Sequence, residues 1–227
     1  MDPRARLRSG LAAANEGRFE DALREYVWFH QHALEHDRAF YGVRLSFALS
    51  YWLDLAKVYP EARRKLEKIR DRKTALLACG GGDRALFHDV ESINDYLGAE
   101  KATYELFLTM AQISPMLAAG CGDLAIEAIV KARDFQLAQK YSPHPEDALL
   151  RFSGDLNGDV ADLKGNAEEN ARRLDAYTHI YCDRVRTTIA ILQGLRKSEE
   201  AEHCREWAVA LVDSRPVRAR IQRMLHK

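Results

Sequence analysis

Residues 10–26 read GLAAANEGRFEDALREY. Two small residues, Gly10 and Ala22, stand on either side of Gly17. Aromatic residues follow at Phe19 and Tyr26. Because a glycine just beyond the last residue of a helix commonly terminates it, Gly17 predicts the end of one helix and Phe19 the start of the next.

The same order of small and apolar residues recurs in weaker form near residues 50–66, 90–106, 126–138 and 189–208. Each segment carries an alanine in the place of Ala22, namely Ala62, Ala102, Ala138 and Ala201. Similarity at intervals along a chain is the sign of a repeat architecture. Alanine, leucine, arginine and glutamate dominate the composition, and these residues favour helices.

Residues 10–26 resemble the core of a tetratricopeptide repeat. The later segments resemble it only through their serial order, and their intervals are wider than that family's repeat of about 34 residues. The resemblance implies that each repeat is an antiparallel helix pair, in which Gly10 and Ala22 allow close approach and Phe19 covers the turn. It implies an all-α fold, a right-handed superhelical stack of antiparallel helix pairs with a C-terminal helical extension.

Residues 142–165 are rich in helix breakers, including Pro143, Pro145 and Gly165. We therefore expect helical repeats over 1–141, a linker or insertion over 142–165, and a long helix with a closing helical pair over 166–227, packed on the same array. Within these segments the pattern predicts helices at 39–58, 146–153 and 160–193, with a break at Gly154–Gly158.

Lysine plus arginine and aspartate plus glutamate number 34 each, so the balance of charge makes a nucleic-acid partner unlikely. The sequence has no apolar stretch of about 18 residues, and we expect no membrane partner. The four cysteines form no CxxC motif, which favours reduced thiols in the cytoplasm.

The usual signatures of nucleotide, zinc-protease and serine-hydrolase sites are missing: GxxxxGK[ST], GxGxxG, HExxH and GxSxG. One weak metal candidate combines His179 and Cys182, three residues apart, with His203 or Cys204. The last two are adjacent and diverge by about 100° on a helix. We expect no catalytic centre, no metal site and no cofactor.

In the resembled family, ligands contact the first helix of each pair along a concave surface. When these contact positions are aligned with the matching repeat positions of this sequence, the resemblance implies the following candidate partner-binding residues: Arg44, Phe47, Tyr51, Asp54, Arg84, Phe87, Glu91, Asn94, Asp95, Glu127 and Lys131. Residues 41–59 are apolar nearly all round, so Tyr51 and Trp52 either fill the core between repeats or face a ligand. The acidic residues near Arg84 either suit a basic or polar peptide or form a solvated face.

These expectations describe a non-catalytic module that binds a protein or peptide partner in its concave groove. One alternative is a dedicated neutralising protein, of the immunity type, that covers a toxin. A second alternative, from another class, is a metal- or nucleic-acid-dependent enzyme or regulator. The fold determines the kind of surface and not its ligand.

Overall fold

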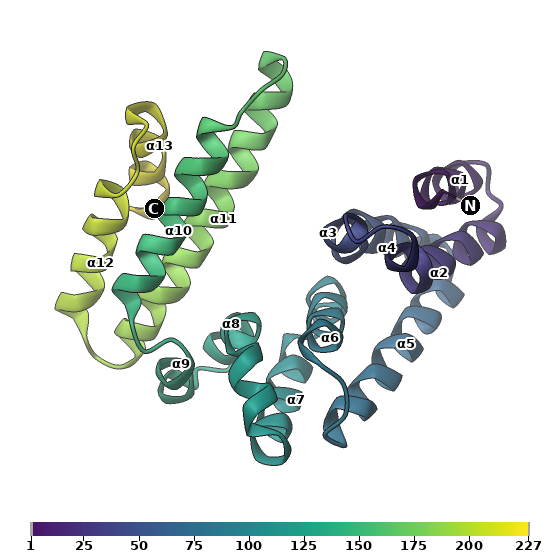
Figure 1. Cartoon of the computed structure of the whole chain (residues 1–227), viewed down its shortest axis with the longest axis horizontal. Helices are drawn as coiled ribbons and strands as arrows, with labels where there is room; N and C mark the ends of the chain where they lie inside the picture. The colour runs from purple at the N-terminus through teal and green to yellow at the C-terminus, as the bar shows by residue number, and fades with distance from the viewer. Residues whose placement is uncertain (1, 227) are drawn as a thin grey trace. The chain divides into compact units, whose positions relative to one another are not determined.

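The computed structural model describes residues 2–226, and within this range the chain forms helices and no strand, which confirms the all-α prediction (Figure 1). Helices of the first half are α1 (Pro3–Asn15), α2 (Phe19–His36), α3 (Phe40–Leu45), α4 (Phe47–Val58), α5 (Pro60–Ala78), α6 (Arg84–Leu97), α7 (Glu100–Ile113) and α8 (Pro115–Lys131). Those of the second half are α9 (Phe135–Tyr141), α10 (Pro145–Ala161), α11 (Ala167–Gly194), α12 (Ser198–Ala210) and α13 (Arg215–Leu225). None of the helices within residues 2–226 has both the length and the apolar character of a membrane span.

The chain divides into two compact units, Met1–Ala125 and Ile126–Lys227, and the division lies within α8. The sequence placed a linker at 142–165, but most of that segment is the helix α10, which packs against α11 in the second unit. Each unit has its own hydrophobic core.

In the first unit, helices that follow one another along the chain pack side by side (Figure 1). The closest packing joins α1 to α2, and further contacts join α2 to α4, α4 to α5, α5 to α6 and α6 to α7. The shared core runs through α1, α2, α4, α5 and α6 and includes Tyr26, Leu49, Trp52, Leu66 and Ile93. Trp52 also donates a hydrogen bond from its indole nitrogen to the Ala62 carbonyl, 2.9 Å away.

α1 and α2 approach each other closely at Gly10, as the resemblance implied. A Cβ atom at this position would lie 2.6 Å from Cε1 of the buried Tyr26 ring. Ala22 and Ala13, on the two helices, have at most 1% of their surface exposed. The turn between the helices contains Gly17, whose φ of 77° lies in the left-handed region that favours glycine.

The single helix predicted over 39–58 is in fact two helices, because the backbone breaks at Ser46. Ser46 has φ −124° and ψ −94°, outside the helical region. Its hydroxyl donates to the Gly42 carbonyl 2.7 Å away, a local bond of the kind that competes with helix continuation. The break separates α3, which carries Arg44, from α4, which carries Tyr51.

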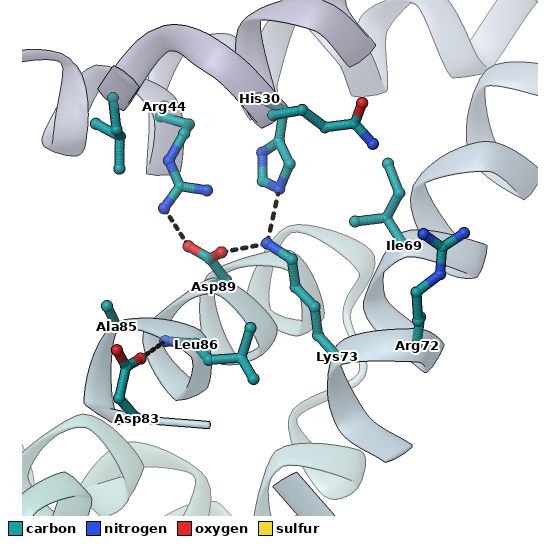
Figure 2. A pocket seen from close by; sticks show the side chains of 11 residues that line it. His30, Arg44, Ile69, Arg72, Lys73, Asp83, Ala85, Leu86 and Asp89 are labelled. Carbon is teal, nitrogen blue, oxygen red and sulfur yellow. Dashed lines mark hydrogen bonds and ion pairs between the residues drawn. The ribbon is translucent and has the colours of Figure 1, made fainter. Parts of the chain in front are cut away.

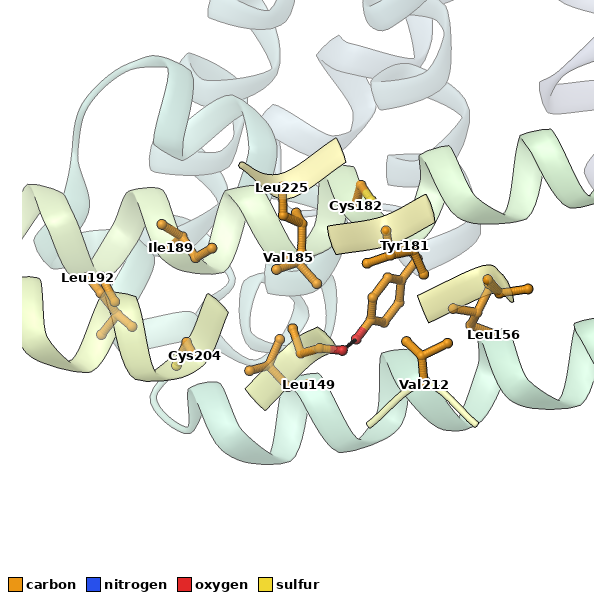
Figure 3. Packing of buried hydrophobic residues seen from close by; sticks show 14 residues of the cluster. Leu149, Leu156, Tyr181, Cys182, Val185, Ile189, Leu192, Cys204, Val212 and Leu225 are labelled. Carbon is orange, nitrogen blue, oxygen red and sulfur yellow. Dashed lines mark hydrogen bonds between the residues drawn. The ribbon is translucent and has the colours of Figure 1, made fainter. Parts of the chain in front are cut away.

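The second unit is organised around the long helix α11 (Figure 3). Leu149 and Leu156 of α10 pack with Val185 of α11, and the Tyr181 hydroxyl donates a 2.6 Å hydrogen bond to the Ala208 carbonyl of α12. The break predicted at Gly154–Gly158 is wrong, because α10 continues through both glycines. A glycine inside a helix costs only about 1 kcal/mol relative to alanine, and burial of the leucine face outweighs that cost.

Two glycine substitutions should have opposite effects on stability. Gly10→Ala should lower the free energy of unfolding by about 1 kcal/mol, because overpacking against Tyr26 exceeds the gain in helix propensity. Gly120→Ala, inside α8 with nothing within 4 Å of its added Cβ, should raise it by up to about 1 kcal/mol. Urea unfolding followed by tryptophan fluorescence measures both, and a stabilised Gly10→Ala protein would contradict the close packing.

Candidate functional site

The exposed face of α4 carries large apolar residues. Phe47, Tyr51, Asp54 and Val58 are spaced by four, three and four positions, so they lie along one side of the helix. Phe47 and Val58 are each 63% exposed, and Tyr51 is half-buried. The opposite side of α4 is buried through Ala48, Leu49, Trp52 and Leu55. The helix is therefore apolar on both its core side and its solvent side.

A cavity of about 230 Å³, here called the α4 cavity, opens beside this stripe between α1, α2 and α4. Its lining consists of Leu11, Ala14, Asn15, Phe19, Tyr26, Tyr51, Asp54, Leu55 and Val58. Tyr26 is buried, and its hydroxyl has no hydrogen-bond partner among the described residues. Burial, with smaller contributions from Tyr51 and Asp54, raises the pKa of Tyr26 to about 12, so the phenol remains a neutral donor.

Three of the predicted binding residues, Phe47, Tyr51 and Asp54, thus share one surface, and the last two line the same cavity. Asp54 is exposed and pairs with Lys57 at 2.7 Å. Arg84 is also exposed, but it lies on α6 and forms two bonds of 2.6 and 2.8 Å to the Asp123 carboxylate. Asp95 is exposed on α6 and Glu91 is half-buried there.

Phe87 and Asn94 are buried, which corrects the prediction that they contact a partner. Phe87 has no exposed area and packs against the Phe107 ring with centroids 6.0 Å apart. Asn94 is 1% exposed, donates to Thr103 Oγ1 at 3.0 Å and accepts from Arg70 at 2.6 Å. Their side chains fill the space between helices, so neither can contact a partner in this structure.

Arg44 is also buried, and Glu127 and Lys131 belong to the second unit. Only the residues of the first unit can therefore be described together as one site. Arg44 has only 4% of its surface exposed and forms part of an ion cluster that the sequence did not predict.

This ion cluster is centred on the buried carboxylate of Asp89 on α6 (Figure 2). Arg44 of α3 donates to one Asp89 oxygen, and the ammonium of Lys73 on α5 donates to the other. Lys73 also lies 3.3 Å from Nε2 of His30 on α2. Four helices therefore contribute to one polar group of side chains.

The cluster forms part of the wall of a second cavity, here called the polar cavity, of about 390 Å³. Its lining consists of His30, Gln31, Leu34, Arg44, Ile69, Arg72, Lys73, Asp83, Ala85, Leu86 and Asp89. One signal in the sequence could have indicated His30. It stands four residues after the core residue Tyr26, on the buried side of α2, where a polar side chain needs a partner.

The surroundings favour the charged form of Asp89 and disfavour the charged forms of Lys73 and His30. Burial acts to raise the pKa of Asp89, but hydrogen bonding to Arg44 and the charges of Lys73 and Arg44 outweigh it, so the pKa is below its ordinary value. Burial lowers the pKa of Lys73, against the attraction of Asp89. Burial, and then the charges of Lys73 and Arg44, lower the pKa of His30 to about 3.

The hydrogen bond from Lys73 determines the tautomer of His30. An ammonium group can only donate, so Nε2 of the neutral ring accepts and Nδ1 carries the hydrogen. Within the described part of the chain, this Nδ1 has no partner, and neither has Nε of Arg44. Two buried N–H donors in the wall of the polar cavity are therefore without acceptors.

Within residues 2–226, no group of three or more histidine, cysteine, aspartate or glutamate side chains is placed to hold a metal ion. Cys182 and Cys204 are buried in the second core, and exposed His179 directs Nδ1 to the Asp175 carbonyl at 2.8 Å. No protein-family model, curated protein or solved structure matches the chain.

His30 should make the first unit sensitive to acid. Between pH 6.5 and about 3 the unfolded chain binds a proton at His30 that the folded chain does not, so stability falls as pH falls through this range. Between pH 7 and pH 5 this amounts to a loss of about 2 kcal/mol. His30→Phe should remove that part of the loss.

Urea unfolding at the two pH values measures the effect, in a Trp207→Phe background so that fluorescence reports on the first unit. His36→Gln, which changes an exposed histidine of the same helix, is the matched control and should keep the full acid dependence. Identical pH dependence in the His30→Phe protein and in the unsubstituted protein would show that His30 is not held neutral.

Proposed function

We propose that the first unit is a non-catalytic interaction module that holds a protein or peptide partner on the exposed face of α4. The observation that carries this proposal is the stripe formed by Phe47, Tyr51, Asp54 and Val58, two of whose apolar members are 63% exposed. Exposed apolar surface next to a cavity and rimmed by polar residues is typical of interaction sites.

The chemistry of the α4 cavity suits a partner side chain that is largely apolar. Phe19 and Tyr51 offer partly exposed aromatic rings, and tyrosine is among the residues that most often dominate binding energy. At the cavity wall, Tyr26 has a buried hydroxyl that finds no acceptor among residues 2–226. A partner group with a carbonyl or hydroxyl oxygen would complement it, because an unpaired buried hydroxyl is unfavourable.

Asp54 contributes the charged edge of this surface. It is exposed and its pair with Lys57 lies within a single turn of α4, where solvent screens the interaction. A cationic side chain of the partner could therefore replace Lys57 at little cost. The surface as a whole favours a partner segment with one large apolar residue flanked by a basic residue.

The finer architecture is part of the same proposal: α1–α2, α4–α5 and α6–α7 are successive repeats of the tetratricopeptide kind, stacked as a right-handed superhelix. In support, the second helix of one pair packs against the first helix of the next, as α2 does with α4 and α5 with α6. In such a stack the first helices face the ligand, and both α1 and α4 line the α4 cavity.

Co-purification with the affinity-tagged full chain, from the cells that naturally produce it, tests this function. Tyr51→Ala should weaken capture of the partner by about tenfold or more, since truncation of a central aromatic contact typically costs about 2 kcal/mol. Phe47→Ser and Asp54→Ala should weaken it by smaller factors. Circular dichroism should show unchanged helix content, because Phe47 and Asp54 are exposed and Tyr51 is only half-buried.

Leu76→Ala is the matched control, because Leu76 is a large apolar residue of α5 that is 51% exposed and lies outside the α4 cavity. It should capture the partner as well as the unsubstituted chain does. Full capture by Phe47→Ser and Tyr51→Ala, both folded, would show that the α4 face is not the interaction surface.

A further inference from the structure

We propose that the polar cavity binds a small monocarboxylic acid with an apolar tail. This site is formed by α2, α3, α5 and the first turns of α6, and none of its lining residues belongs to the α4 cavity. The inference therefore goes beyond the proposed function and does not depend on it.

The size and the two-sided character of the polar cavity point to a small molecule. Its volume of about 390 Å³ lies within the range of small-ligand sites, about 300–1,000 Å³. Leu34, Ile69 and Leu86 supply an apolar part of the wall. Arg44, His30 and Lys73 supply the polar part, where Figure 2 shows their side chains gathered around Asp89. A ligand with one polar end and one apolar end matches this division.

The net charge of the cavity lining favours a ligand whose polar end carries one negative charge. Arg44, Arg72 and Lys73 are cationic, and Asp83 and Asp89 are anionic, which leaves one excess positive charge while His30 is neutral. A monoanion neutralises this excess. A dianion would be repelled by the Asp89 carboxylate, and a cation would meet three positive side chains.

The unpaired donors of the cluster indicate an acceptor group. His30 Nδ1–H and Arg44 Nε–H are buried and lack partners within residues 2–226, whereas the two Asp89 oxygens are directed to Arg44 and Lys73. In Figure 2 the Nδ1 edge of the imidazole is turned toward Arg44. A carboxylate has two acceptor oxygens and can accept from both kinds of donor once the side chains move to expose these two buried nitrogens to the cavity.

Calorimetric titration of the full chain with octanoate tests the site. Octanoate should bind saturably with one molecule per chain. Octylammonium, which has the same tail and the opposite charge, should not bind. Acetate, which lacks the tail, and octanol, which lacks the charge, should each bind at least about tenfold more weakly, because each loses one half of the recognition. Absence of saturable octanoate binding, or equal binding of octylammonium, overturns the proposal.

Two variants locate the binding within the polar cavity. Because His30 is neutral, His30→Phe removes an N–H donor without changing the net charge of the lining, and it should weaken octanoate binding by about tenfold. Ala85→Trp places a large side chain on an exposed residue of the cavity wall and should abolish binding without replacing any core residue. If both variants bind octanoate as the unsubstituted chain does, the polar cavity is not the site.

Ala119→Trp is the matched control, since Ala119 is an exposed alanine of α8 that does not line the cavity. It should leave octanoate binding unchanged. Tyr51→Ala should also leave it unchanged, because Tyr51 lines the α4 cavity and not the polar cavity. Failure of the partner-binding proposal and failure of the carboxylate proposal can therefore be told apart.

Discussion

The buried carboxylate of Asp89 constrains how the helices of the first unit can be arranged. It lies on α6 and can remain charged only because Arg44 of α3 and Lys73 of α5 both donate to it. Replacing a whole buried ion cluster with apolar residues is often harmless, but removing one partner typically costs about 3–5 kcal/mol. The cluster therefore holds α3, α5 and α6 in one relative position, and through Lys73 it also determines which ring nitrogen of His30 carries hydrogen.

Trp52 links this cluster to the proposed interaction surface. Its ring lies 6.1 Å from His30, in the wall of the polar cavity, and 6.5 Å from Tyr26, in the wall of the α4 cavity. Trp52 itself is 1% exposed and is held by its bond to the Ala62 carbonyl. Each cavity thus includes in its wall a residue whose ring lies close to that of Trp52.

Residue type alone did not show which aromatic side chains belong to the candidate surface, because burial separates residues of the same type. Tyr51 and Trp52 are adjacent in the sequence, and either could have filled the core. About 100° of helical rotation separates them, which places Trp52 inside and leaves Tyr51 half-buried. Asn94 was assigned to the binding surface by its register in the resembled repeat, but its amide lies inside the unit, where it is satisfied by Thr103 and Arg70.

From the sequence alone, local preferences determined the helical content and the turn at Gly17, because these depend on neighbours a few residues away, whereas the close approach at Gly10 followed from the resemblance to a repeat family. Tertiary structure decided the rest. Because its leucine face is buried, α10 remains helical at Gly154 and Gly158. The backbone break at Ser46 divides the single helix expected there into α3 and α4. His30, Arg44, Lys73 and Asp89 come from four helices, and burial of a charge depends on which distant partners reach it, so no local pattern in the sequence could have brought them together.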